Sequence, residues 1–403
     1  MGLRVGITER LTSSIAPFAR VCLLAGVTCL ALACAARTAR APGAVAPAER
    51  GLLRLLGAIA YPAGALTLPD APRFGSLSGL AFDARSGQWA GAIDETNPPR
   101  LGWMDITFGA TLAVTPLRFT VLHPGPRVSP ETFAGLELES LVAMPDGSFA
   151  VTTEGYHDTK NIVHQAEVVF VQRDGTVTGS VHPRAHFTIV SGDRTRGVRH
   201  NLGLESLTRT PDGRLLSGME QPLIQDGAMS DSVHGGVVRL LEFVERRGRG
   251  WAPGREWAYQ LEPTAVVPGY GRPCDDGENG LSDMLALTDE RWLTLERACL
   301  LGTPGAPAYN TVRVYEVTTL AADDVSGLPS LAGQHPRLVT KRLVLDVDTL
   351  LPGLPPIWST GSNFEALAWG PPGPRGERTV VMMSDDNLRA TQTTALLWLA
   401  WQP

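Results

Sequence analysis

The chain has 403 residues, of which 43% are hydrophobic, and this is enough for one large domain or two ordinary ones. Its formal net charge is −6, and lysine occurs only at Lys160 and Lys341. The clustered basic surface that nucleic-acid binding requires is therefore excluded.

The N-terminus has the features of an export signal. Arginines at positions 4, 10 and 20 precede an apolar run over residues 21–33, which ends at Cys34. The run is too short to span a bilayer and is typical of the hydrophobic region of a secretory signal. Residues 30–34 resemble a bacterial lipoprotein cleavage box, in which Cys34 becomes the lipidated first residue. Ordinary signal cleavage after a small residue is the alternative.

Residues 1–34 are therefore expected to be a signal peptide. We expect the protein to be exported, either to the periplasm or to the outer membrane or cell surface with a lipid anchor at Cys34, and to have no transmembrane span. Residues 35–50 are rich in Ala, Pro and Arg without periodicity, which indicates a disordered linker. The folded domain then occupies residues 51–403.

Beyond Cys34 the chain has two cysteines, Cys274 and Cys299. In an exported protein two such cysteines are candidates for one disulfide. A pair of free thiols is the alternative.

One pattern recurs five times along the domain. Each copy has a serine or glutamate, an apolar run, a turn, a second apolar run and an acidic residue, and the copies begin at Ser78, Glu139, Glu205, Ser282 and Glu365. Two copies have Pro-Asp-Gly between the apolar runs, a strong hairpin signal because glycine accepts the positive φ of the turn. Repetition at such intervals indicates a radially repeated fold.

Further strand-like runs follow each hairpin. Third strands are expected at residues 101–106, 167–172, 236–244, 311–317 and 394–400, and fourth strands at 117–122, 186–190, 256–261 and 342–347. The fifth unit ends without a fourth strand, which residues 52–61 would supply. The sequence thus predicts an all-β fold, a β-propeller of five four-stranded blades closed by an N-terminal strand. A six-bladed ring with one degenerate blade is the alternative, and a β-sandwich is disfavoured.

This geometry would collect the acidic residues at one place. The residue that opens the first strand of an antiparallel hairpin and the residue that closes the second lie at the same edge of the sheet. Five blades around an axis therefore bring these positions to the mouth of the central channel. The closing positions are Asp94, Glu154, Glu220, the pair Glu296–Arg297, and Asp385.

Crowded carboxylates raise one another's pKa unless a cation offsets their charge. A hard divalent cation with oxygen ligands, most plausibly calcium, resolves the repulsion. Acids that accept hydrogen bonds from the next blade and serve only ring closure are the alternative. The expected metal ligands are Glu139, Glu205, Glu365 and Asp385.

Other side chains on the same face are candidates for catalysis and substrate binding. Glu154 or Glu220 would serve as general base, and His157 as a proton shuttle, with a solvated loop histidine as its alternative. Arg199 and Arg297 would clamp an anionic substrate through charge-assisted hydrogen bonds, with interblade salt bridges as their alternative.

Five segments in the right order resemble the phytase-like family, described as "esterase-like activity of phytase". They are Ser78-Gly79-Leu80, Glu139-Ser140-Leu141 with Glu154-Gly155, residues 201–207 (NLGLESL), residues 293–297 (LTLER), and Asn363-Phe364-Glu365-Ala366-Leu367 with Ser384-Asp385. The chain departs from the family pattern at residues 386–388. The resemblance implies an exported β-propeller with phosphoesterase or esterase activity.

Together these observations predict a calcium-assisted hydrolase of ester bonds, with phosphate monoesters as the substrates. We expect it to act as a monomer on a small anionic ester. Two alternatives stay open: a non-catalytic propeller that presents a binding surface at the cell envelope, and a lactonase-type calcium propeller.

Overall fold

The computed structural model describes residues 52–69, 73–95, 97–126, 128, 133, 135–157, 163–274 and 277–402. The predicted signal peptide and linker, with Cys34, lie outside the described residues. In the described part the chain forms twenty-four strands and four short 3₁₀ helices. No helix among these residues is long and apolar enough to cross a membrane.

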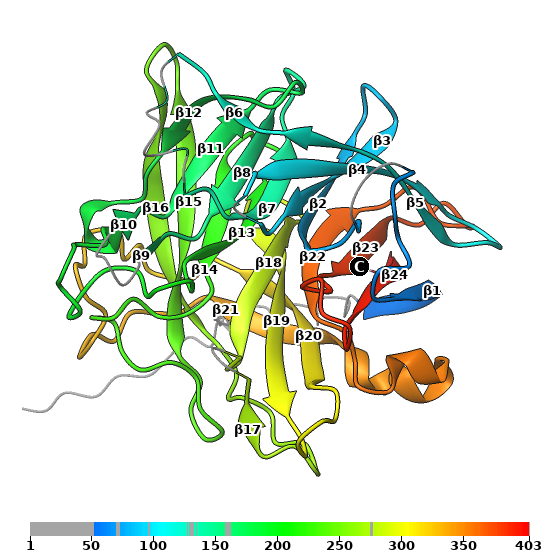
Figure 1. The fold of residues 1–403 in the computed structure, drawn as a ribbon. Helices are drawn as coiled ribbons and strands as arrows, with labels where there is room; N and C mark the ends of the chain where they lie inside the picture. Colours follow the sequence, from blue (N-terminus) through cyan, green and yellow to red (C-terminus); the bar gives the residue numbers. More distant parts are fainter. Residues whose placement is uncertain are drawn as a thin grey trace, which may run out of the picture. The chain divides into compact units, whose positions relative to one another are not determined.

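Four-stranded antiparallel blades account for most of the strands (Figure 1). In chain order the blades are β2 (Leu77–Asp83), β3 (Gln88–Ile93), β4 (Arg100–Thr107) and β5 (Ala113–Val121); β7 (Leu138–Ala143), β8 (Phe149–Thr153), β11 (Glu167–Val171) and β12 (Thr176–Val181); β13 (Leu204–Arg209), β14 (Leu215–Met219), β15 (Val237–Arg246) and β16 (Gly250–Gln260); β18 (Gly280–Ala286), β19 (Arg291–Leu301), β20 (Tyr309–Thr318) and β21 (Thr340–Asp346); and β22 (Phe364–Trp369), β23 (Thr379–Ser384), β24 (Thr393–Gln402) and β1 (Leu52–Pro62).

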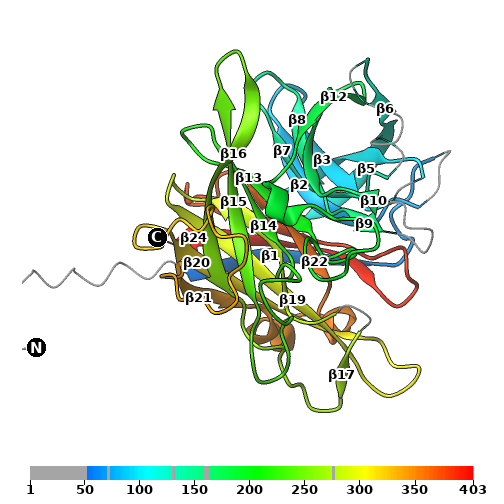
Figure 2. The ribbon, with the colours of Figure 1, turned by 90° about the vertical axis from the view of Figure 1, so that its left-hand side faces the viewer.

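Two short strands extend blades, and two others form a separate small sheet. β6 (His123–Pro124) extends the second blade, and β17 (Arg272–Pro273) extends the fourth, at a projecting end of β19 that Figure 2 shows. A separate two-stranded sheet is formed by β9 (Tyr156–His157) and β10 (Val163–His164).

The ring closes as the sequence predicts. β1 pairs antiparallel with β24, with Leu52 opposite Gln402, so the start of the described chain completes the last blade. The first strands of the blades (β2, β7, β13, β18 and β22) contact one another in cyclic order, and β22 contacts β2. The five-bladed propeller is therefore confirmed, and the six-bladed alternative is wrong.

The fourth strand of the second blade is not where the sequence analysis put it. It is β12, whereas residues 186–190 begin within the 3₁₀ helix η1 (Ala185–Phe187). The cause is an Asp-Gly turn directly after β11, in which Gly175 has a φ of +92° and Gln172 N–H bonds to the Thr176 carbonyl. Such a turn sends the chain straight back beside β11.

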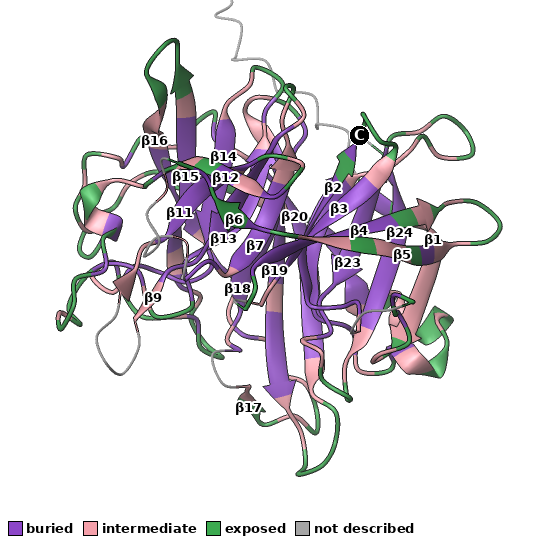
Figure 3. Cartoon of the chain, turned by 45° about the horizontal axis from the view of Figure 1, so that its top comes forward, coloured by how far each residue is buried: buried purple, intermediate pink, exposed green. Residues whose placement is uncertain are grey.

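The core lies between the blades. Figure 3 shows the central strands buried along much of their length and the hairpin ends and loops exposed. Between the third and fourth blades, the Trp257 and Trp292 rings meet edge to face with centroids 5.4 Å apart. Edge-to-face pairs of this kind add to the free energy gained from burial.

Every first strand carries a β-bulge at its opening residue. The pairing register shifts between Leu77 and Gly79, Leu138 and Leu141, Leu204 and Ser206, Leu281 and Asp283, and Phe364 and Ala366. The residues left out of the ladder are the opening residues of the five repeats, with Ser140 in addition. Because a bulge bends the strand and re-aims a side chain, these five positions turn away from the blade faces at the same level.

Below the level of the bulges, one buried carboxylate links the first strands of several blades. Asp283 of β18 is 1% exposed and accepts hydrogen bonds from Ser140 Oγ (2.9 Å), Leu207 N (3.5 Å) and Leu367 N (2.5 Å). These donors belong to three other blades. Asp283 therefore ties four of the five blades together.

We expect Asp283→Ala to lower the melting temperature by several degrees. The substitution leaves three buried donors without an acceptor, and each such donor costs about 1–3 kcal/mol. Thermal unfolding followed by circular dichroism measures the loss, with Asp105→Ala, at an exposed position of β4, as the matched control. Equal melting temperatures for the two variants would show that Asp283 does not hold the blades together.

Candidate functional site

A cavity of about 320 Å³ opens at the end of the propeller where the bulged residues lie. Its lining is mostly polar, and the residues that form it come from all five blades and from the loops between strands. It is lined by Asp94, Glu139, Glu154, Asn201, Leu202, Glu205, Glu220, Cys274, Gly277, Arg297, Cys299, Asn363, Glu365, Asn387, Arg389 and Gln392. The structure thus brings together six of the predicted site residues: Glu139, Glu154, Glu205, Glu220, Arg297 and Glu365.

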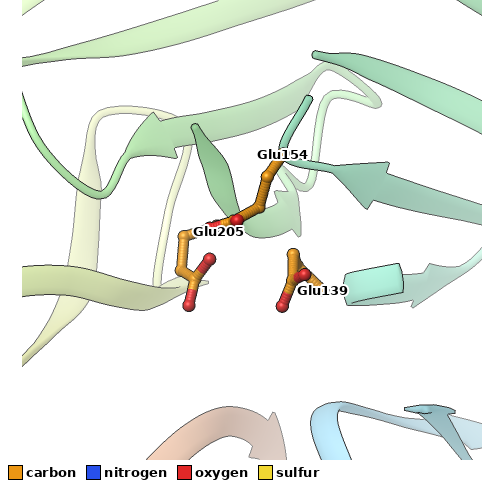
Figure 4. Close-up of side chains that lie close together, drawn as sticks. All are labelled: Glu139, Glu154 and Glu205. Atoms are coloured by element: carbon orange, nitrogen blue, oxygen red, sulfur yellow. The ribbon is translucent and has the colours of Figure 1, made fainter. Parts of the chain in front are cut away.

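Three glutamates form the tightest group in the cavity wall. One carboxylate oxygen from each of Glu139, Glu154 and Glu205 lies within 4.8 Å of the other two (Figure 4). The residues are 5%, 3% and 5% exposed. Glu205 Oε2 is buried and has no hydrogen-bond partner. Three hard oxygen donors this close, one of them unsatisfied, suit a cation such as calcium.

Neighbouring blades place these glutamates. Glu139 and Glu205 are the bulged residues of β7 and β13, and Glu154 directly follows β8. The backbones approach closely here, since a Cβ at Gly203 would lie 2.0 Å from the Glu154 carbonyl oxygen. Only glycine permits this approach, which brings the third repeat against the end of the second.

Burial and mutual repulsion raise the pKa of the cavity acids. Burial raises the pKa of Glu139 and Glu154 well above the usual value, and neighbouring carboxylates add to the effect, Asp94 for Glu139 and Glu205 for Glu154. Burial likewise raises the pKa of Glu205 to about 7. The pKa of Asp94 rises to about 7 through burial and the charges of Glu365 and Glu137. A cation bound in the cavity would therefore lower the electrostatic free energy of these carboxylates.

One guanidinium lies among these acids. Arg297 contacts Glu365 at 2.9 Å, Glu220 at 3.4 Å and Glu205 at 3.7 Å, and its side chain is 12% exposed. Burial by itself would lower its pKa, but the three carboxylates outweigh burial and raise it. Arg297 therefore stays positively charged in the cavity wall. It forms salt bridges between blades, which is the alternative role stated for it above.

Two of the expected metal ligands have other partners. Glu365 accepts hydrogen bonds from Ser78 Oγ (3.1 Å) and Asn363 Nδ2 (2.8 Å) in addition to its ion pair with Arg297. Asp385 is buried, does not line the cavity, and accepts a hydrogen bond from Asn387 N at 2.6 Å. These contacts leave Glu139, Glu154 and Glu205 as the group best placed to hold a cation.

Arg199 and His157 are not part of the cavity lining. The Arg199 guanidinium donates to the backbone carbonyls of Pro222 (2.9 Å) and Gly227 (2.7 Å), so it holds a loop. The His157 ring lies 5.0 Å from the His200 ring, in the segment that carries β9.

The serine and acidic positions of the five repeats do not identify the polar residues of the cavity rim. Asn201, Asn387, Arg389 and Gln392 come from loops between strands. With its amide nitrogen turned toward the acids, Asn201 donates to Glu137 (3.1 Å) and Glu154 (3.3 Å). Asn201 stands in the segment 201–207 that resembles the phytase-like family, whereas Arg389 and Gln392 belong to none of the segments that carry the resemblance.

Backbone strain is concentrated at the same rim. Among the described residues, four that are not glycine have a positive φ: Ser76 (55°), Asn201 (52°), Asn387 (44°) and Leu388 (49°). Asn201 and Asn387 line the cavity, and the Ser76 carbonyl accepts a hydrogen bond from the backbone of Asp94. Strained residues cluster at functional sites because the surrounding structure must hold them in place.

A disulfide braces one side of the cavity. Cys274 and Cys299 are bonded, with their Cα atoms 5.4 Å apart, and both residues line the cavity. The bond confirms the pairing expected from the cysteine count. It joins the loop before β18 to β19, two residues beyond Arg297.

Comparison with known proteins identifies one family. The family model described as phytase-like, esterase-like activity of phytase, matches residues 72–388. No curated protein matches the chain.

Similar solved structures share little sequence with the chain. Endo-arabinase from Bacteroides thetaiotaomicron aligns at 9% identity with a TM-score of 0.40, over 84% of this chain and 95% of that one. Hydrazine synthase from Kuenenia stuttgartiensis aligns at 11% identity with a TM-score of 0.36, over 78% of this chain and 66% of that one. A protein of unknown function from Dyadobacter fermentans aligns at 10% identity with a TM-score of 0.38, over 87% and 99%. At these TM-scores the likenesses carry no information about activity.

The raised pKa of Asp94 predicts a pH-dependent gain in stability for Asp94→Asn. The pKa of Asp94 is about 7 in the fold against an ordinary value of 3.8, so in the metal-free protein the folded state binds the proton more tightly. The free energy of unfolding then falls as the pH rises from about 4 to 7, because Asp94 ionises at a cost only in the folded state. Asp94→Asn removes that cost.

The measurement is the melting temperature in EDTA at pH 5 and pH 8. Asp94→Asn is expected to raise it more at pH 8 than at pH 5, and Asp105→Asn to change it equally at both. A pH-independent effect of Asp94→Asn would contradict the charge crowding around Asp94.

Proposed function

The chain belongs to the phytase-like family, and from this premise we propose that it is an exported hydrolase of anionic ester bonds, foremost phosphate monoesters. The reaction would take place in the acidic cavity at the mouth of the propeller. A divalent cation, most plausibly calcium, would assist it.

The observation that carries the proposal is the group Glu139, Glu154 and Glu205. One carboxylate oxygen from each lies within 4.8 Å of the other two, and Glu205 Oε2 is buried without a hydrogen-bond partner. Without a cation, a cavity so rich in carboxylates would repel an anionic ester. A bound calcium ion would neutralise the oxygens of the substrate and lower the pKa of a water molecule.

Asp94 is the general base in this proposal. It lines the cavity, forms no ion pair with a described residue, and its pKa of about 7 lies where a base can both hold and release a proton at neutral pH. Glu154, a base candidate from the sequence, belongs to the cation-binding group. Glu220 is the other candidate, and its carboxylate forms an ion pair with Arg297 at 3.4 Å.

Arg297 has a positioning role. Its three carboxylate partners come from the third and fifth blades, so it keeps the cavity wall together. A guanidinium occupied in this way has little capacity left to bind substrate.

Two observations support export. The N-terminal 34 residues have the pattern of a secretory signal, and the disulfide between Cys274 and Cys299 is of the kind that persists in oxidising compartments. A lipid anchor at Cys34 would keep the protein at the membrane surface.

Calcium is expected to raise the melting temperature of the EDTA-treated protein by several degrees. A ligand that binds only the folded state stabilises it by about 4 kcal/mol at a thousand times its Kd. Glu205→Gln should abolish the calcium shift, while Glu245→Gln, at an exposed position of β15, should keep it. No shift in the wild type would favour the alternative of a non-catalytic propeller with structural acids.

Asp94→Asn is expected to reduce hydrolysis of p-nitrophenyl phosphate by about 10²-fold or more in kcat/KM, because general bases contribute about 10²–10⁴-fold to the rate. The same variant should be more stable than the wild type at pH 8, so misfolding would not explain the loss. Parallel assays with p-nitrophenyl acetate separate phosphatase from carboxylesterase activity. Unchanged turnover in Asp94→Asn would remove Asp94 from the mechanism and leave Glu220 as the base.

A further inference from the structure

We infer that Arg389 is the specificity-determining residue of this site, and that it binds an anionic oxygen of the ester substrate at the cavity rim. The inference rests on the proposed function and names the group that would select charged esters over neutral ones. It concerns recognition and assigns Arg389 no part in bond cleavage.

The first step is the state of the other arginines near the mouth. Arg297 is held by three carboxylates, and Arg199 donates to two backbone carbonyls outside the cavity lining. Neither guanidinium is available for a substrate. The clamp that the sequence analysis expected must therefore come from elsewhere.

Arg389 meets this need. It is exposed, lines the cavity, and its guanidinium forms no hydrogen bond or ion pair with the residues that the structure describes. In a cavity lined by six acidic residues, a cation that has no carboxylate partner is unusual. Its charge is free for an incoming anion.

The loop that carries Arg389 is held firmly. Asp386 is 1% exposed and accepts hydrogen bonds from Ser76 N (3.0 Å), Leu388 N (3.1 Å) and Thr394 Oγ1 (3.2 Å). The backbone N–H of Arg389 donates to the Asp386 carbonyl at 2.8 Å. The buried carboxylate thus ties the loop to Ser76 and to Thr394 of β24.

Further contacts hold the strained part of the loop. Arg73 donates to the Leu388 carbonyl at 2.7 Å, and Asn387 N donates to Asp385 at 2.6 Å. Asn387 and Leu388 are consecutive residues with positive φ, an arrangement that costs free energy. Asn387 Nδ2 also donates to Gln392 at 3.0 Å, so three cavity-lining residues of one loop share a fixed frame.

The placement of charges around the cavity explains why Arg389 would select anionic esters. The cation-binding glutamates lie in the buried wall, and Arg389 lies at the exposed rim. A phosphate ester that enters the cavity would meet a cation inside and a guanidinium outside, which contact different oxygens. Guanidinium groups bind phosphate and carboxylate oxygens through strong charge-assisted hydrogen bonds.

The test compares charged and neutral substrates in the calcium-loaded protein. Arg389→Ala should raise KM for p-nitrophenyl phosphate about tenfold or more with little change in kcat, because the lost contact is the same in the bound substrate and the transition state. Kinetics with p-nitrophenyl acetate should be unchanged. Arg389→Lys should restore part of the KM, and Arg375→Ala, an exposed arginine in the β22–β23 turn at the other end of the blade, should change neither substrate.

Binding of inorganic phosphate, measured by calorimetry, separates this inference from the proposed function. Phosphate binding that is weakened about tenfold in Arg389→Ala supports the inference even if the wild type hydrolyses neither ester. Equal KM changes for both esters, or phosphate binding that is the same in Arg389→Ala and wild type, would overturn it. Absence of phosphate binding to the calcium-loaded wild type would overturn it as well.

Discussion

The constraint on which this structure depends is the convergence of buried carboxylates on the propeller axis with one buried guanidinium among them. Each first strand bulges at its opening residue, and the bulges lie at one level because the ring closes through β1 and β24. Arg297 offsets the charges of Glu205, Glu220 and Glu365. Burial and the charges of nearby carboxylates raise the pKa of Glu139 and Glu154.

The same region also carries the strain of the backbone. All four described non-glycine residues with positive φ lie at or next to the cavity rim. Asp386 and the disulfide between Cys274 and Cys299 hold two of the loops at the mouth. Strain and repelling charges in one place are expected where function has been favoured over stability. In the body of the blades, burial raises the pKa of Asp283 to about 8, and both of its carboxylate oxygens accept hydrogen bonds from other blades.

Much of the fold follows from the sequence because hairpin signals are local. Pro-Asp-Gly turns and period-two apolar runs locate the inner strands, and the acid at each strand end locates the mouth. The sequence predicts the fourth strand of the second blade at residues 186–190, but the Asp174-Gly175 turn returns the chain at once as β12. The bulges and the partners of Glu365, Asp385 and Arg199 depend on which loops approach the ring. The hydrogen bond between Ser78 and Glu365 joins residues 287 positions apart, and no short pattern reports it.

The central claim is that the cavity acids are arranged to hold a cation, and a crystal soaked in calcium or a lanthanide tests it most directly. The account predicts a strong anomalous peak about 2.3–2.6 Å from carboxylate oxygens of Glu139, Glu154 and Glu205. A map without that peak, in which the three carboxyl groups are hydrogen-bonded to one another at the same ion concentration, would contradict it.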